Sequence, residues 1–230
     1  MKTLGIVGGI GPESTVEYYR LLIRRARESG AAHNPPIVIN SIDVAAMLEL
    51  ILSDRLREAA DYVLGAVQAL GRAGADVGLL ASNTPHIVFE DIAARSPIPL
   101  LSIVEATADA AFAMGARRLG LLGTRATMQG GFYQKVFAAR GLSIALPGPA
   151  DQVLVHDRYL AELVPGDYRE ETRVAVLAVV DRLVKDQAVQ AVILGGTELP
   201  LLLRASHHAG VPLLDTTRIH VERAVVEILR

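Results

Sequence analysis

Short runs of valine, isoleucine and leucine alternate with longer segments of helical periodicity along most of this 230-residue chain. This alternation is typical of β–α–β units, in which helices cover a sheet of parallel strands. The pattern therefore predicts a doubly wound α/β fold. Strands are expected at residues 3–7, 37–42, 77–81, 100–103, 119–122, 189–194 and 211–215. Helices are expected at residues 12–28, 55–71, 103–114, 130–140, 166–185 and 218–229.

An internal repeat indicates two similar lobes. Residues 4–9 are similar to residues 119–124 at an offset of 115, and residues 75–84 are similar to residues 189–198 at an offset of 114. Two pairs at nearly one offset predict a first lobe at residues 1–98 with 208–230 and a second at 99–207. Chance similarity between parallel strands stays open as the alternative, because identity within each pair is low.

The composition narrows the class of partner. Hydrophobic residues make up 51% and charged residues 21%, which excludes disorder as the dominant state. The formal net charge of -2 provides no electrostatic footprint for nucleic acid or an anionic membrane, so small molecules or other proteins are expected as partners. No apolar run reaches about 18 residues and the first residues lack the pattern of a signal peptide, which favours a cytoplasmic protein.

The chain contains no cysteine. Disulfides, thiolate metal sites and thiol nucleophiles are excluded with it. The six histidines lack the helical spacing of a zinc protease, so no metal is expected, and His207 and His208 are expected as a solvated pair on a helix. A serine hydrolase is disfavoured because Gly-x-Ser-x-Gly is absent.

A glycine-rich loop follows the first expected strand. Residues 8–15 read Gly-Gly-Ile-Gly-Pro-Glu-Ser-Thr and open a helix, so backbone N–H groups could hold a carboxylate or a phosphate. The alternative is a turn needed only for packing. A dinucleotide fingerprint is disfavoured because Ser14 replaces the third glycine, and no lysine follows for a phosphate-binding P-loop.

Polar residues follow three further strands. Ser82, Asn83 and Thr84 end one of them and precede a proline, so they could bind an anion or cap a helix. Residues 195–198, Gly-Gly-Thr-Glu, are their counterparts in the other lobe, and residues 124–127 supply further donors or caps. Because ligands of open α/β sheets bind outside the carboxyl ends of the strands, the four loops are expected to converge on one cleft between the lobes.

Four segments in this order resemble the cofactor-independent aspartate/glutamate racemase family. They are residues 4–15 with Tyr18 and Tyr19, residues 81–86, residues 121–127 with 131–133, and residues 192–203. The resemblance covers nearly the whole chain. It implies an isomerase with two similar flavodoxin-like lobes and parallel sheets, an amino acid or carboxylate bound in the cleft between them, no cofactor, and a cytoplasmic homodimer.

The resemblance also implies a mechanism in which two cysteines face opposite sides of the α-carbon. Their positions are matched here by Ser82 and Gly196. General acid–base catalysis needs a pKa near the working pH, whereas a serine hydroxyl has a pKa far above the thiol value of about 8.5 and glycine has no proton to give. The two-thiol mechanism is therefore not possible in this chain.

Other positions of the family pattern are retained. As implied by the resemblance, main-chain recognition of an amino acid falls to Ile10, Gly11, Asn83, Thr84, Thr124, Thr127 and Thr197 for the carboxylate, with Glu198 or an adjacent carbonyl for the ammonium. The lysine that acidic-substrate racemases tend to carry after Glu-Leu-x-x-Gly is replaced by Asp167. A distal carboxylate is disfavoured unless Arg125 or Arg169 compensates.

Three functions stay open at this point. The chain could be a racemase-like enzyme that uses other proton-transfer groups, either as a natural variant or with its cysteines replaced. It could be a non-catalytic amino-acid or carboxylate binding protein on the same scaffold. It could also be a related carbanion-forming lyase or isomerase, although such enzymes use at least one cysteine as a rule.

Overall fold

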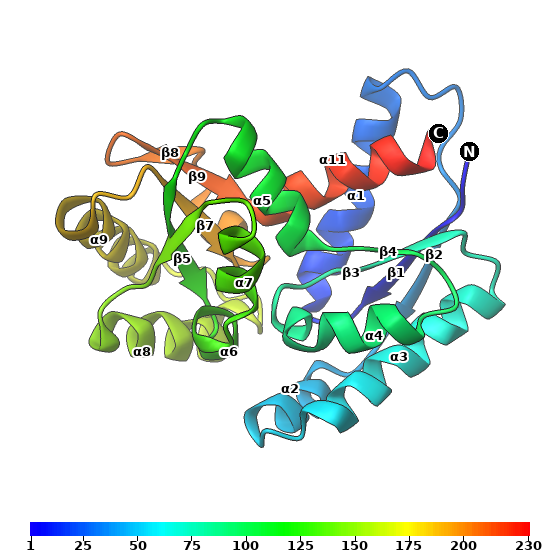
Figure 1. Cartoon of the computed structure of the whole chain (residues 1–230), viewed down its shortest axis with the longest axis horizontal. Coiled ribbons are helices and arrows are strands. Elements are labelled where there is room, and N and C mark those ends of the chain that lie inside the picture. Colours follow the sequence, from blue (N-terminus) through cyan, green and yellow to red (C-terminus); the bar gives the residue numbers. More distant parts are fainter. The chain divides into compact units, whose positions relative to one another are not determined.

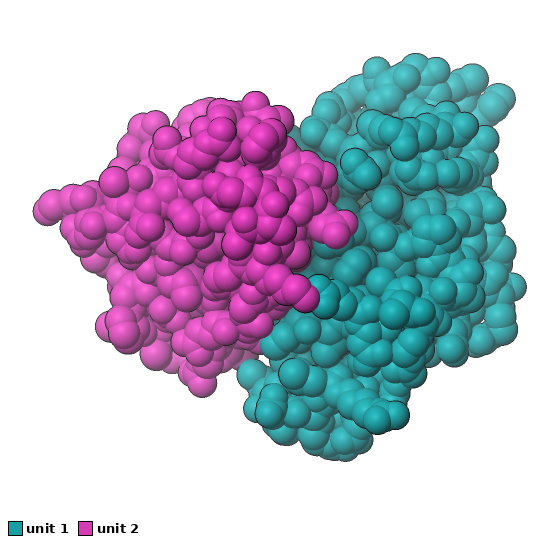
Figure 2. Space-filling view, viewed as in Figure 1, with its two compact units in different colours: residues 1–103, 217–230 teal, residues 104–216 magenta.

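The computed structural model describes residues 1–230 and divides into two compact units. The first contains Met1–Ile103 with Thr217–Arg230, and the second contains Val104–Thr216 (Figure 2). No helix is long and apolar enough to cross a membrane.

The first unit is built on a four-stranded parallel sheet in the order β2-β1-β3-β4. The strands are β1 (Leu4–Gly8), β2 (Ile37–Ser41), β3 (Val77–Leu80) and β4 (Leu100–Leu101). The central strands β1 and β3 are buried throughout, which explains their unbroken apolar sequence.

Helices cover both faces of this sheet, with α1 and α11 on one side and α3 on the other (Figure 1). Pro12 occupies the first turn of α1, where its missing N–H costs nothing. Tyr18, Leu21 and Leu22 lie on the buried stripe of α1 and pack against β1 and β3. The helical elements are α1 (Pro12–Glu28), α2 (Val44–Leu52), α3 (Leu56–Arg72), the 3₁₀ turn η1 (Thr84–Val88), α4 (Phe89–Arg95) and α11 (Thr216–Ile228).

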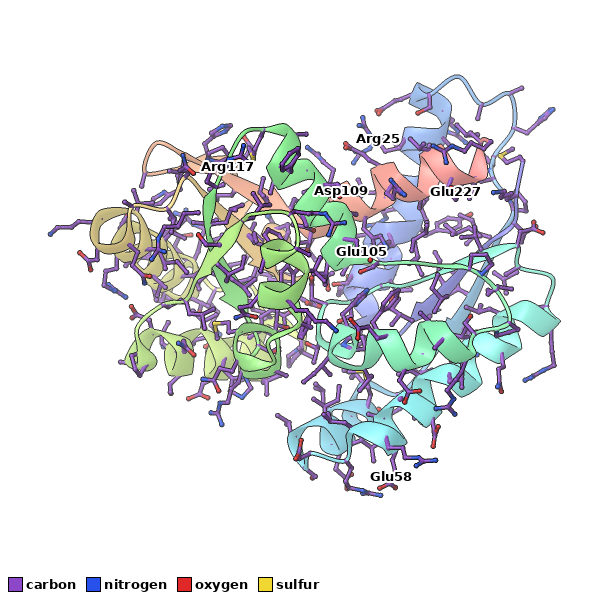
Figure 3. The ribbon with its side chains drawn as sticks, viewed as in Figure 1. Arg25, Glu58, Glu105, Asp109, Arg117 and Glu227 are labelled. Atoms are coloured by element: carbon purple, nitrogen blue, oxygen red, sulfur yellow. The ribbon has the colours of Figure 1, made fainter.

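Both chain termini lie in the first unit, where the Lys2 amide donates to the Ile228 carbonyl at 2.9 Å. Ion pairs on the outer helices support the same packing: Arg25 of α1, which is labelled in Figure 3, contacts Glu222 of α11 at 2.6 Å. Both side chains are exposed, so such a pair contributes about 0–1 kcal/mol. The apolar core therefore provides most of the stability.

The second unit holds a five-stranded sheet in the order β6-β5-β7-β9-β8. The strands are β5 (Arg118–Gly123), β6 (Ser143–Ala145), β7 (Ala191–Gly195), β8 (His207–His208) and β9 (Val211–Asp215). All pair in parallel except the edge strand β8, which is antiparallel to β9.

The core of the second unit joins these strands to helices on their faces, with α9 and α8 against β5 and β7. Val176, Val179, Val180 and Leu183 form the buried stripe of α9 at helical spacing. The helical elements are α5 (Ile103–Ala113), α6 (Arg125–Gln129), α7 (Phe132–Ala138), α8 (Pro149–Arg158), the π-helical turn η2 (Tyr159–Leu163), α9 (Glu170–Gln187) and α10 (Leu199–Leu203).

The two sheets have the same strand order. In the first, β1 lies between β2 and β3, and β4 follows β3; in the second, β5 lies between β6 and β7, and β9 follows β7. Leu4 pairs with Val77 in the first sheet, and Leu119 pairs with Ala191 in the second. The repeat in the sequence is therefore a repeat of structure, and the prediction of an α/β fold with two similar lobes is confirmed.

The structure differs from the sequence-based expectations at several places. The expected lobe boundaries shift, because β4 pairs with β3 and keeps residues 99–103 in the first unit, while β9 pairs with β7 and keeps residues 208–216 in the second. The assignment of His207 and His208 to a helix is wrong, since they form β8. Strand β6 and the helices α2, α4, α6, α8 and α10 were not expected.

Candidate functional site

The glycine loop after β1 is closely packed against the first turns of α1. Gly9 has a φ of +83°, and its amide donates to the Thr15 hydroxyl at 2.9 Å. A side chain on Gly8 would overlap Thr15, and one on Gly9 would lie 2.6 Å from the Ser41 hydroxyl. Gly8 and Gly9 are thus needed for close packing of the turn, which is the alternative to ligand binding given for this loop. Ile10 and Gly11, which were predicted to bind substrate, are buried in this loop.

The residues after β3 lie beside that loop, because β1 and β3 are paired neighbours whose carboxyl ends are in register. Ser82, Asn83 and Thr84 are all less than a tenth exposed. Asn83 occupies the cap position of η1, yet its side chain makes no capping hydrogen bond. Capping of η1 therefore does not account for the asparagine.

His86 is the histidine nearest in sequence to Ser82, and the structure engages both of its ring nitrogens. The Ile103 amide donates to Nε2 at 3.3 Å, so Nδ1 carries the proton and donates to the Ser82 carbonyl at 2.9 Å. Burial, with a further contribution from His220, lowers the pKa of His86 to about 3. His86 holds the backbone of the loop and is not available to activate the Ser82 hydroxyl.

In the second unit, Thr124 and Thr127 follow β5 and form a helix cap. The Thr124 hydroxyl accepts from the Thr127 amide at 3.2 Å and lies 3.1 Å from the Thr127 hydroxyl. Thr124 is the N-cap of α6, so capping is established for this pair. Both side chains are buried at the end of the strand.

The loop after β7 lies beside this cap, because Gly123 and Gly195 are register partners. Thr197 and Glu198 are 3% and 2% exposed, and the Thr197 hydroxyl donates to Glu198 Oε2 at 3.1 Å. Tyr159 also donates its phenolic hydrogen to Glu198 Oε2. The structure therefore places a buried carboxylate that accepts two hydroxyl hydrogen bonds directly after the central strand of the second sheet.

Gly196 has no positive φ, so its backbone suits any residue. Its lack of a side chain has a steric cause: a β-carbon here would lie 2.6 Å from the Tyr159 hydroxyl oxygen and 2.7 Å from Cζ. The Tyr159 ring fills this space and is 5% exposed. Tyr159 is not among the site residues expected from the sequence, and no sequence pattern marks it.

The acidic side chains of the segment from 162 to 169 are paired with nearby arginines. Glu162 is buried, pairs with Arg158 and accepts from the Thr172 hydroxyl. Asp167 pairs with Arg169 at 2.5 Å. Arg169 therefore compensates Asp167 itself, and Arg125, the other cation considered for this task, is exposed.

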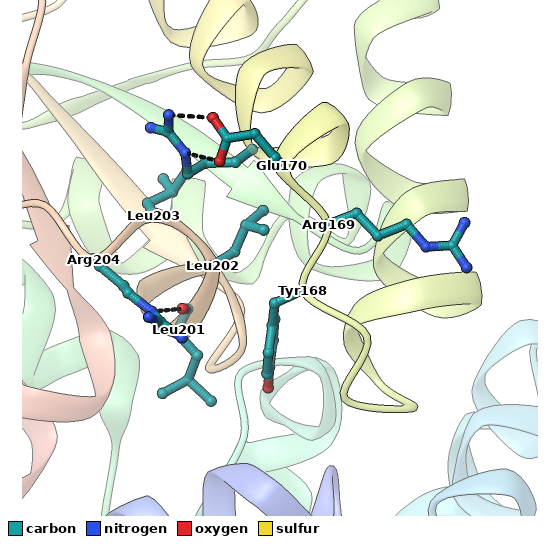
Figure 4. Close-up of a pocket in the computed structure, with 8 residues that line it drawn as sticks. Tyr168, Arg169, Glu170, Leu201, Leu202, Leu203 and Arg204 are labelled. Atoms are coloured by element: carbon teal, nitrogen blue, oxygen red, sulfur yellow. Dashed lines mark hydrogen bonds and ion pairs between the residues drawn. The ribbon is translucent and has the colours of Figure 1, made fainter.

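A pocket of about 330 Å³ opens between the start of α9 and α10 (Figure 4). Within it Arg173 pairs with Glu170, and Arg204 donates to the Leu201 carbonyl at 3.1 Å. None of the predicted site residues lines this pocket. It is therefore distinct from the loops that follow β5 and β7.

Comparison with known proteins adds a second line of evidence. Residues 7–224 match the pattern of the Asp/Glu/Hydantoin racemase family. The chain is 30% identical over 146 residues to the broad specificity amino-acid racemase RacX of Bacillus subtilis (strain 168), covering 61% of this chain and 63% of that enzyme. The alignment with that enzyme thus spans less than two thirds of its length.

Solved structures match over the full chain. A crystal structure of a candidate Asp/Glu racemase from Yersinia pestis has a TM-score of 0.88 at 36% identity and covers 100% of both chains. An aspartate racemase homologue from Pyrococcus horikoshii OT3 has a TM-score of 0.82 at 31% identity, over 99% of both chains. The glutamate racemase of Aquifex pyrophilus, with a TM-score of 0.66 at 20% identity over 100% of this chain and 84% of that one, shares the fold.

Proposed function

We propose that this chain, which belongs to the Asp/Glu/Hydantoin racemase family, binds a free amino acid with the loops that follow strands β1, β3, β5 and β7. One observation carries the proposal. Buried polar side chains stand directly after the central strands of both repeated sheets, namely Asn83 and Thr84 after β3, and Thr197 and Glu198 after β7. Ligands of open α/β sheets bind at such strand ends.

Each group has a role that its chemistry suits. Backbone amides of Ile10 and Gly11 and the polar groups of Asn83 and Thr84 donate to the α-carboxylate, together with Thr124, Thr127 and the backbone amide of Thr197, whose hydroxyl already donates to Glu198. Glu198, or a carbonyl beside it, receives the ammonium group. Asp167 disfavours a distal carboxylate, because its charge repels a second anion and Arg169 is already paired with it. Small or neutral amino acids are therefore the preferred ligands.

The reaction does not use two thiols. Ser82 stands in the place of one family cysteine, and the structure gives it no histidine base, because His86 is bound to the Ser82 carbonyl and the Ile103 amide. Gly196 stands in the place of the other, and its side-chain space is filled by Tyr159. These two observations favour a second candidate function, a binding protein without catalysis.

Isothermal titration calorimetry with both enantiomers of alanine, serine, aspartate and glutamate tests binding. Asn83→Ala should weaken binding about 10- to 150-fold, since a lost hydrogen bond to a charged group is worth about 1.5–3 kcal/mol. Asn34→Ala, an exposed asparagine of the same unit, is the control and should change nothing. Absence of heat with every ligand at millimolar concentration would refute the proposal.

The family resemblance further supports a homodimer that works without a cofactor in the cytoplasm. Light scattering behind size-exclusion chromatography measures the assembly directly. A mass of twice 24.5 kDa is expected, and a mass of 24.5 kDa would contradict it.

A further inference from the structure

Tyr159 stands where position 196 would otherwise project a side chain. The β-carbon that any larger residue would carry at 196 falls inside the contact distance of the tyrosine ring and hydroxyl. The two residues therefore exclude each other: the ring is present because position 196 is glycine. The Tyr159 hydroxyl occupies the space that a side chain at position 196 would take.

The phenol is held there by specific contacts. Its hydroxyl donates to Glu198 Oε2, and Thr197 donates to the same oxygen at 3.1 Å. Burial, and then the Glu198 carboxylate, raise the pKa of Tyr159 well above its usual range. The phenol is neutral at pH 7, with its proton directed at a carboxylate that can accept it.

The backbone around Tyr159 is irregular in a way that fixes the ring. Residues Tyr159–Leu163 form a π-helical turn, in which the Val164 amide donates to the Tyr159 carbonyl at 3.0 Å. π-Helical turns are rare in proteins overall, and those that occur are often found at functional sites. Glu162 on the same turn is anchored by Arg158 and Thr172, which fixes the turn to α8 and α9.

Resting on the function proposed above, we propose that Tyr159 and Glu198 form the proton-transfer pair of the second unit and take the place of a thiol at position 196. The Cα–H proton of the amino acid passes to the Tyr159 oxygen while the tyrosine's own proton passes to Glu198 Oε2. The electron pair stays on the substrate and is delocalised into its carboxylate.

The reverse steps return a proton to the same carbon. In deuterated water the Tyr159 hydroxyl, which now carries the former Cα proton, exchanges that proton for solvent deuterium through Glu198 while the carbanion persists, and the deuteron then passes from Tyr159 to the face that the proton left. Ser82 cannot transfer a proton at the opposite face at neutral pH. His86 is bound to the Ser82 carbonyl, and no other base is hydrogen-bonded to the Ser82 hydroxyl. The pair therefore exchanges the α-proton of one enantiomer with retention of configuration.

Proton NMR of each amino acid in deuterated water measures this exchange. Tyr159→Phe keeps the ring and removes the hydroxyl, and we expect it to lower the exchange rate at least tenfold while the dissociation constant changes less than threefold. Tyr133→Phe is the matched control, since Tyr133 is equally buried in the same unit and its hydroxyl binds Thr107. Its exchange rate should equal that of the unmodified chain.

The outcomes separate the two proposals. Equal exchange rates in Tyr159→Phe and the unmodified chain, or binding without any exchange, would overturn the proton-transfer pair and leave amino-acid binding intact. Absence of binding would overturn the proposed function itself. Glu198→Gln, which keeps the size of the side chain and removes the proton acceptor, provides the same test should Tyr159→Phe fail to fold, with binding measured by calorimetry on the same variant: lost exchange with binding retained supports the pair, and retained exchange overturns it.

Discussion

Placing a methyl group on Gly196 should destabilise the chain through its overlap with Tyr159. The new carbon would lie 2.6 Å from the tyrosine oxygen and 2.7 Å from Cζ, about 1 Å inside the optimal separation of roughly 3.5–4.0 Å. Overpacking of this kind costs about 1–3 kcal/mol. The backbone adds nothing, because Gly196 has no positive φ.

A double-mutant cycle isolates that cost. Gly196→Ala, Tyr159→Ala and the double variant are unfolded in urea, and their free energies of unfolding are compared. Tyr159→Ala alone should cost about 3–5 kcal/mol, as expected for loss of a buried aromatic ring. Gly196→Ala should then cost almost nothing further, which gives a coupling free energy of about 1–3 kcal/mol.

Gly148→Ala is the matched control, since a β-carbon there meets no atom within 4 Å. Its cost reflects only the poorer capping of α8 by alanine at this N-cap position, so it should be the same with and without the Tyr159 ring. Additivity of Gly196→Ala and Tyr159→Ala within about 0.5 kcal/mol would refute the steric account of Gly196.

Three further predictions concern stability and specificity. Burial lowers the pKa of His86 to about 3 and the pKa of His220 to about 4, so protonation of either histidine favours the unfolded chain. The stabilising effect is complete above pH 6.5, and the free energy of unfolding should fall by about 2 kcal/mol per histidine from pH 7 to pH 5. Urea midpoints that do not move over this range would contradict the prediction. Thr124→Ala removes the cap of α6 and should cost about 1 kcal/mol in urea unfolding, whereas an unchanged midpoint would show that the cap is dispensable. Asp167→Lys should tighten binding of aspartate relative to alanine in calorimetry, and an unchanged ratio would remove Asp167 from the specificity argument.

Much of the architecture could be predicted from the sequence, because its central elements are long and strongly patterned. The helix at Pro12–Glu28 matches its predicted range, and its first residue is a proline, which suits the first turn of a helix. Strands β1 and β3 and their counterparts β5 and β7 could be predicted because fully buried parallel strands have continuous apolar sequences. Strands β6 and β8, of three and two residues, are too short to show any periodicity.

The loops of the candidate site could be predicted because they begin where the strongly patterned strands end. The position of Tyr159 beside Gly196 could not be predicted from the sequence. Its place at Gly196 depends on a π-helical turn and on packing between segments distant in the sequence, and a tyrosine on a helix normally indicates only a buried face. The clash at Gly196 likewise exists only in three dimensions, so the sequence alone does not show which side chain occupies that space.

Chiral chromatography of alanine and serine after incubation with the purified chain, alongside calorimetry on the same sample, separates amino-acid binding from racemisation. We propose that this chain of the racemase family binds an amino acid and does not carry out the two-thiol reaction. The account predicts binding together with no racemisation above about 1 per second, the lower end of usual enzyme turnover. Racemisation of either amino acid above that rate would contradict it, because proton-transfer groups would then have to act on both faces of the α-carbon.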